Sequence, residues 1–280
     1  YYHLITLIKR VQAMTKTAPK TIFLKDYTEP DFWIDSVDLR FELGEESTKV
    51  TTTLAVTRNK SRPAGLPLVL NGQEVALVSL HLNGEELAPQ QYTVTDDSLT
   101  IPEVPDTFEL ITNVTIKPQE NTSLEGLYKS GTMFCTQCEA EGFRKITYCL
   151  DRPDVMSKFT TTIVGDNQRY PFMLSNGNLV EEGTTPDGQR WVKWEDPHKK
   201  PSYLFALVAG PLKFIEDSYT TTSGRDVKLQ IFVEPENIDK CDHAMESLKQ
   251  SMKWDEDVFG LEYDLDIYMI VAVNDFNMGA

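Results

Sequence analysis

The sequence has few of the residues that build metal centres and disulfide scaffolds. It contains four histidines and four cysteines in 280 residues, and His3, His81, His198 and His243 are scattered along the chain. Four cysteines are too few for a disulfide-rich fold. No stretch approaches the roughly 18 apolar residues of a membrane span, so we expect no membrane partner.

Basic residues are also scarce. The chain has 27 Lys and Arg against 43 Asp and Glu, which gives a formal net charge of −16. Nucleic acids bind to a concentrated basic face, so this balance argues against a nucleic-acid partner. Hydrophobic residues make up 40% of the chain and aromatic residues 10%. This composition is sufficient for hydrophobic cores, and the length is typical of about two domains.

The N-terminal segment differs in charge from the rest of the chain. Residues 1–20 contain four basic residues and no acidic residue. They lack the longer apolar region and the small-residue cleavage site of a secretory signal. We therefore expect Met14 to be the true start and residues 1–13 to be a disordered upstream extension. The missing signal and the few cysteines favour a cytoplasmic location.

Hydrophobic periodicity predicts a mainly β chain. Apolar and polar residues alternate with the period of two that is typical of half-buried strands. The alternating segments are 35–43, 49–58, 76–82, 91–101 and 107–117, with shorter segments at 159–164, 172–174, 190–194 and 203–208. The predicted turns are Asn71-Gly72, Asn83-Gly84, Asn176-Gly177 and Asp187-Gly188. Short strands with such turns indicate an N-terminal antiparallel β-saddle or sandwich domain.

The pattern changes after residue 211, where we place a domain boundary. Two further strands are followed by apolar residues at three- and four-residue spacing between Asn237 and Trp254. This spacing predicts an amphipathic helix with Asn237 as its N-cap and Gly260 at its end. The apolar run at 265–273 predicts a buried strand.

One short segment contains the candidate functional residues. Cys135-Thr136-Gln137-Cys138 could be half of a zinc site or a redox pair. No second CxxC and no histidine at ligand spacing accompanies it, so two ordinary thiols are favoured. The acids Glu139 and Glu141 follow directly. A carboxylate here is either solvated surface or, if it faces a cleft, a partner for a cationic ligand group.

Several ordered strings resemble one enzyme family. They are Leu124–Tyr128, Thr136–Arg144, Asp151–Asp154, Tyr203–Gly210, Ser251–Glu256 and Phe259–Val273, which leads to Phe276–Ala280. From about Asp26 onward they resemble the zinc-dependent gluzincin aminopeptidases, the family that includes bacterial aminopeptidase N. The resemblance implies a β-saddle domain at residues 14–211. It also implies that residues 212–280 open a thermolysin-like α+β catalytic domain with its β-sheet and first helix.

The resemblance also implies roles for five residues. Glu139 would hold the free α-amino group of a peptide substrate, assisted by Gln137. Met278 resembles a methionine that cushions the first substrate side chain, and the backbone of Gly279 and Ala280 would line the substrate as an added strand. A fixed carboxylate suits an exopeptidase, because it binds an ammonium group and discriminates against internal peptide bonds.

The zinc motif of that family, His-Glu-x-x-His with a downstream Glu, is missing, and the sequence has no His-Glu dipeptide. We therefore expect this chain to be the N-terminal fragment of a metalloaminopeptidase, which is a hydrolase of peptide catabolism. The zinc ligands of that enzyme are expected to lie beyond Ala280. The chain alone is expected to be monomeric, to bind no catalytic zinc and to be inactive. Two alternatives remain: a non-catalytic β-sandwich binding module, and an epoxide-hydrolase-type or inactive relative of the same superfamily.

Overall fold

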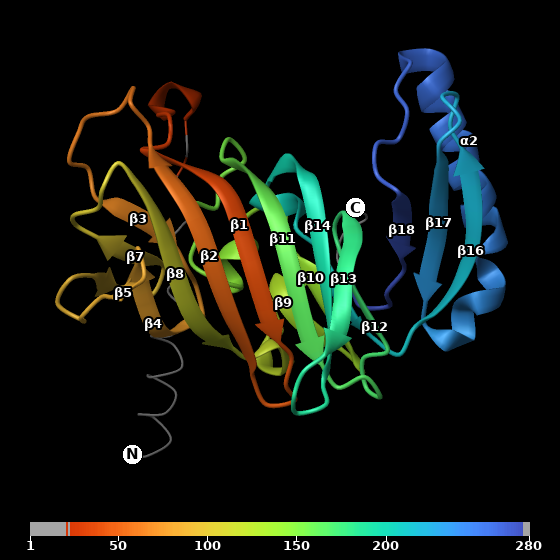
Figure 1. Cartoon of the computed structure of the whole chain (residues 1–280), viewed down its shortest axis with the longest axis horizontal. Coiled ribbons are helices and arrows are strands. Elements are labelled where there is room, and N and C mark those ends of the chain that lie inside the picture. The colour runs from red at the N-terminus through yellow and green to blue at the C-terminus, as the bar shows by residue number, and fades with distance from the viewer. Residues whose placement is uncertain (1–20, 22, 277–280) are drawn as a thin grey trace, which may run out of the picture.

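The computed structural model describes residues 21 and 23–276, and most of the elements in Figure 1 are strands. The expected extension at residues 1–13 lies outside the described residues. The described strands form one eight-stranded sheet, one four-stranded sheet and two three-stranded sheets. The fold is therefore mainly β, as predicted. None of the helices in the described part of the chain could cross a membrane.

The eight-stranded sheet, here called the large sheet, has the order β13-β14-β11-β1-β2-β8-β4-β5. Its strands are β1 (Phe32–Glu42), β2 (Thr48–Arg58), β4 (Ala76–Leu82), β5 (Glu85–Glu86), β8 (Thr107–Ile116), β11 (Met156–Gly165), β13 (Asn178–Thr184) and β14 (Arg190–Pro201). Neighbouring strands are antiparallel except β1 and β11, which run parallel and pair Val37 with Phe159. A parallel pair thus lies inside a sheet that the sequence predicts to be antiparallel.

The four-stranded sheet, here called the small sheet, packs on the buried face of the large sheet. Its order is β12-β15-β10-β9, with bounds β9 (Gly126–Ser130), β10 (Met133–Gln137), β12 (Phe172–Ser175) and β15 (Leu207–Gly210). Leu39 and Phe41 of β1 are fully buried in the core between the two sheets. The ring of Phe41 stacks on Phe205 with centroids 5.9 Å apart. A short sheet of β3 (Leu68–Asn71), β6 (Thr93–Val94) and β7 (Ser98–Ile101) completes this part of the chain.

Two of the four predicted turns are confirmed. Asn83 and Gly84 both have positive φ between the paired strands β4 and β5, and Gly188 has φ +87° between β13 and β14. Asn176-Gly177 is not a hairpin turn, because it connects β12 of the small sheet to β13 of the large sheet. Asn71-Gly72 is not a hairpin turn either, because Asn71 ends β3 and forms an isolated β-bridge with Cys149.

The last part of the described chain, here called the C-terminal unit, is a three-stranded sheet covered by one helix (Figure 1). It contains β16 (Lys213–Thr220), β17 (Asp226–Val233), β18 (Ile267–Val271) and α2 (Asp242–Phe259), with β17 central and parallel to β18. Met245, Leu248 and Met252 of α2 pack on alternate residues of β17. Phe232, on the opposite face of β17, belongs instead to the core of the two larger sheets.

The predicted C-terminal end of the helix is confirmed, and the predicted N-terminal end is wrong. Gly260 has φ +64° and ends α2, as expected. The helix begins after Cys241 and not at Asn237, which lies in a 3₁₀ turn, η5 (Pro235–Lys240). The Asn237 side chain accepts a hydrogen bond from Lys240 Nζ at 2.7 Å, so it does not cap α2. The predicted buried strand at 265–273 is shorter, and its residues are only partly buried.

Candidate functional site

The first two predicted site residues lie together at the end of β10. Gln137 is the last residue of β10 and pairs with Gly126 at the start of β9. Its side chain is buried, and its Nε2 donates to the backbone oxygen of Glu139 at 3.1 Å. Glu139 is exposed, and its peptide bond to Ala140 is cis. Gln137 therefore holds the backbone from which the Glu139 carboxylate projects.

A glycine permits the tight turn that follows. The Gly142 N–H donates to the Cys138 oxygen at 2.8 Å, which folds the chain back onto the β9–β10 hairpin. A Cβ at residue 142 would lie 2.5 Å from the Gln137 oxygen and 2.8 Å from the Gly126 nitrogen. Both contacts are with backbone atoms, so only glycine allows this approach.

The two acids of this turn differ in their charge environment. Glu141 forms an ion pair with Arg144 at 3.2 Å, and Arg144 Nε also donates to the buried Asp151 at 3.0 Å. The Ser202 hydroxyl donates to the other oxygen of Asp151 at 2.6 Å. Within residues 23–276, the Glu139 carboxylate has no such ion-pair partner. Glu139 is therefore the acid of this turn that is available to a cationic ligand group.

The cysteines of the CxxC belong to the core. Cys135 and Cys138 are both free thiols and both buried. Burial raises the pKa of Cys135 to about 12 and raises the pKa of Cys138 well above its usual range. A thiol must be deprotonated to attack a substrate, so burial makes both cysteines poor nucleophiles.

The segment that precedes the remaining site residues is attached to β9. The Tyr128 hydroxyl donates to the Asp275 backbone oxygen at 2.8 Å, and the Ser130 hydroxyl donates to the Asp275 carboxylate at 2.7 Å. Burial raises the pKa of Tyr128 to about 12, so its hydroxyl stays a donor. Met278, Gly279 and Ala280 lie outside the described residues.

The described residues do not form a site for the zinc that the resemblance implies. His81 lies on β4, His198 on β14 and His243 on α2. Within the described part of the chain, no group of three or more His, Cys, Asp and Glu side chains could hold a metal ion.

Sequence reasoning missed the residues that support the candidate site. Arg144 and Asp151 both occur in the strings that carry the resemblance, but no periodicity indicates that they contact each other. Ser202 is farther along the chain and has no sequence signal of its own. The contact of Tyr128 with Asp275 was also missed, because it joins residues that are 147 positions apart in the sequence.

Comparison with known proteins gives consistent matches. The model of the peptidase M1 N-terminal domain matches residues 33–204. Aminopeptidase N of Escherichia coli (strain K12) is 51% identical over 262 residues, and aminopeptidase N of Caulobacter vibrioides is 49% identical over 267 residues. These alignments cover 94% and 95% of this chain but 30% and 31% of the relatives. The chain thus spans about 30% of the length of the curated relatives it matches.

Solved structures agree with the sequence comparison. Aminopeptidase A of Legionella pneumophila, solved in complex with aspartic acid, has a TM-score of 0.88 and 38% identity, covering 93% of this chain and 31% of that chain. The M1 zinc metallopeptidase of Deinococcus radiodurans shares the fold, with a TM-score of 0.69 and 16% identity over 86% of this chain and 56% of that chain. Since the family model matches more than half of its residues, the chain belongs to the peptidase M1 family.

Proposed function

We propose that this chain is the N-terminal part of a zinc aminopeptidase in which Glu139 binds the α-ammonium group of a peptide substrate. The observation that carries the proposal is the contrast between the two acids of one turn. Both acids are exposed, but Glu141 is paired with Arg144, whereas Glu139 has no ion-pair partner among the described residues. The named relatives are aminopeptidases, which act at a free N-terminus by definition.

The position of Glu139 suits this role physically. Its backbone is held by Gln137 and by the turn closed at Gly142, so the carboxylate projects from a defined point. A peptide N-terminus carries an ammonium group and an internal peptide bond does not. A charge-assisted hydrogen bond to a fixed carboxylate contributes about 1.5–3 kcal/mol, and this energy selects for exopeptidase cleavage.

The same proposal assigns the rest of the chain. Residues 14–211 form the saddle domain, and residues 212–280 begin the catalytic domain. Met278 would contact the first substrate side chain, and the backbone of Gly279 and Ala280 would pair with the substrate. The zinc ligands are assigned to residues beyond Ala280. The isolated chain should therefore be inactive, and the intact protein is expected to be cytoplasmic and monomeric.

The test is Glu139→Gln in the intact protein. We expect kcat/KM for an aminoacyl amide to fall about 10- to 100-fold, because an energy of about 1.4 kcal/mol corresponds to a factor of ten. The matched control is Glu141→Gln on the same turn, which should change kcat/KM less than about threefold since an exposed ion pair contributes little. An unchanged kcat/KM in Glu139→Gln would contradict the assignment.

A second measurement separates amine binding from a structural role. The ratio of kcat/KM for a free-amine substrate to that for its N-acetylated form should fall in Glu139→Gln. If both substrates lose activity equally, Glu139 supports the fold and does not bind the amine. The purified chain 1–280 should release no amino acid from the same amide. Release that a chelator abolishes would contradict the assignment of the zinc ligands.

A further inference from the structure

A cavity of about 430 Å³ lies between the C-terminal unit and the rest of the chain. This volume is within the range of pockets for small ligands, about 300–1,000 Å³. Its walls come from β12, β13 and β14 on one side and from β16, β17 and the start of β18 on the other. Neither Gln137 nor Glu139 lines it. The cavity is therefore separate from the proposed amine-binding residues.

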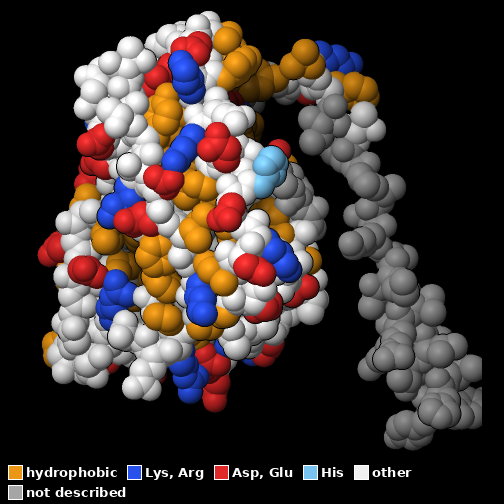
Figure 2. Space-filling model, turned by 90° about the vertical axis from the view of Figure 1, so that its right-hand side faces the viewer, with side chains coloured by type: hydrophobic (Ala, Val, Ile, Leu, Met, Phe, Trp, Pro, Cys, Tyr) orange, Lys and Arg blue, Asp and Glu red, His pale blue; other side chains and the backbone are white. Residues whose placement is uncertain are grey.

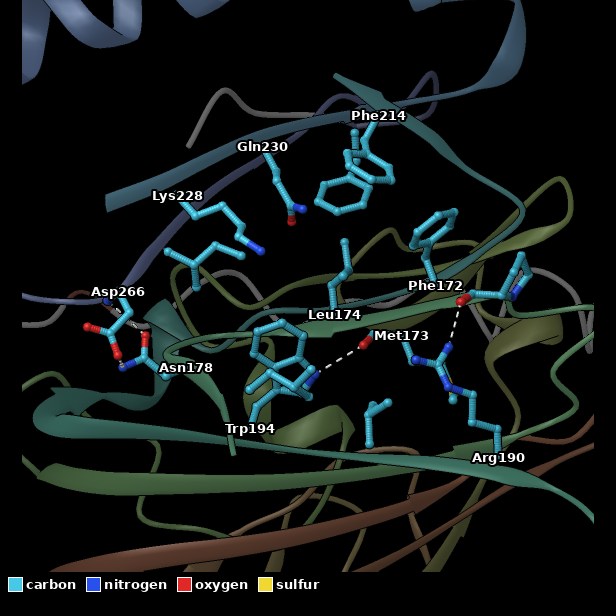
Figure 3. A pocket seen from close by; sticks show the side chains of 15 residues that line it. Phe172, Met173, Leu174, Asn178, Arg190, Trp194, Phe214, Lys228, Gln230 and Asp266 are labelled. Carbon is cyan, nitrogen blue, oxygen red and sulfur yellow. Dashed lines mark hydrogen bonds between the residues drawn. The ribbon is translucent and has the colours of Figure 1, made fainter. Parts of the chain in front are cut away.

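Aromatic rings form much of the wall. Phe172, Phe214 and Phe232 contact one another with ring centroids 5.2–5.6 Å apart. Trp194 faces them from β14, and its indole N–H is already bonded to the Met173 oxygen at 3.0 Å. Trp194 thus offers its ring and no free donor. Figure 3 shows Phe214 above and Phe172, Leu174 and Trp194 below, with their side chains directed toward the same space. Such a set favours a flat apolar group.

The charged groups of the wall are not equally engaged. Arg190 bonds to Glu182 and to the Pro171 oxygen, each at 2.7 Å. Asp266 accepts from Asn178 at 3.0 Å.

Lys228 differs from both of these groups. Its ammonium group forms only a long ion pair with Glu216 at 3.9 Å, and its side chain has no hydrogen-bond partner among the described residues. Figure 3 shows its ammonium group directed into the cavity beside Gln230. Lys228 is thus a cation whose donors are available to an anionic ligand.

We propose that this cavity binds a small aromatic carboxylate. The ring lies between Trp194 and the phenylalanine cluster, and the carboxylate accepts hydrogen bonds from Lys228. A carboxylate is favoured over a cation because the acid of the wall, Asp266, already accepts a hydrogen bond from Asn178 and pairs with Arg225 at 3.7 Å. A ligand held in this way contacts both the C-terminal unit and the rest of the chain.

The test is calorimetric titration of the intact protein with two probes, 3-phenylpropionate and its uncharged analogue 3-phenylpropionamide. The acid should bind saturably, with one site per chain, and the amide should bind about tenfold more weakly, because it lacks the charge-assisted bond. Lys228→Met should weaken binding of the acid about tenfold and leave the amide unchanged. Lys228 is 54% exposed, so this variant should fold.

Three controls locate the binding site. Lys213→Met removes an exposed lysine of β16 that does not line the cavity, and it should change neither affinity. Phe214→Ala should weaken the binding of both probes to the same degree, since it removes a contact with the ring that the two probes share. Glu139→Gln should leave both affinities unchanged, and this control separates the cavity from the proposed amine site. The proposal is overturned by any of three results: absence of saturable binding, equal binding of acid and amide, or wild-type affinity in Lys228→Met.

Discussion

Backbone atoms around residue 142 determine where the Glu139 carboxylate lies. The Gln137 oxygen and the Gly126 nitrogen both approach the position of a residue-142 Cβ within 3 Å. Gly126 and Gln137 are register partners in the β9–β10 hairpin. Because these atoms belong to paired strands, they cannot move aside as the end of a flexible side chain could.

We predict that Gly142→Ala lowers the free energy of unfolding by about 2–3 kcal/mol, the upper range for inserting a methyl group into a packed site. Urea unfolding of the variant and the parent measures this. Gly188→Ala is the control, because its φ of +87° causes strain but no atom lies within 4 Å of the new Cβ. The control should cost about 1 kcal/mol. Equal losses in the two variants would show that the close contact is unimportant.

The sequence offers two candidate site residues near this turn, but it does not reveal the difference between the two acids. Gln137 and Glu139 follow from the resemblance. The pairing of Glu141 depends on Arg144 in the next turn and on how Asp151 holds that arginine. Such a network depends on the tertiary fold, so neither spacing nor composition could reveal it.

Among the elements, the long strands that alternate in burial, such as β1, β2 and β8, are ones that the sequence predicted. β2 alternates almost perfectly, because one face is in the core and the other is not. All five residues of β10 are buried, and most residues of β13 are exposed. Neither has a period of two, so both strands were missed. Alternation shows which face is buried but not which strand is the neighbour, so the parallel pairing of β1 with β11 was also missed.

The helix gives a prediction at the same scale. Leu248 lies in the middle of the buried face of α2 and packs on the core of the C-terminal unit. Leu248→Ala should lower the unfolding free energy by about 2–4 kcal/mol, through lost burial and the cavity left behind. Thermal unfolding with a matched exposed control, Gln250→Ala, measures this. If both variants lose the same small amount, α2 does not pack on the sheet as described.

At the scale of the whole molecule, β18 is shared between two cores. Ile267, Met269 and Val271 pack against the core of the larger sheets, whereas Tyr268 and Ile270 pack against the core under α2. A reciprocal pair of hydrogen bonds lies at one end of this strand. The Asn178 amide donates to the Asp266 carboxylate, and the Asp266 N–H donates back to the Asn178 side chain, each at 3.0 Å.

We predict that Asp266→Ala loosens this attachment. Losing one such hydrogen bond costs about 1 kcal/mol, so amide hydrogen exchange in β18 should accelerate about fivefold while β1 is unaffected. Asp264→Ala is the control. This variant removes only the ion pair between Asp264 and His198. The pair contributes little because both side chains are exposed, His198 by 52% and Asp264 by 66%. Equal acceleration in both variants would contradict the role of the Asn178–Asp266 pair.

The parallel pairing of β1 with β11 has a consequence for synthesis on the ribosome. β1 and β2 emerge early and can pair as neighbours, but β11 emerges only after the whole β3–β10 region has been made. Until then one edge of β1 has no strand beside it in the nascent chain. An open edge beside apolar residues favours intermolecular pairing. Premature termination before Met156 would therefore release a product with this edge exposed, and such a product is a candidate for aggregation or quality-control degradation.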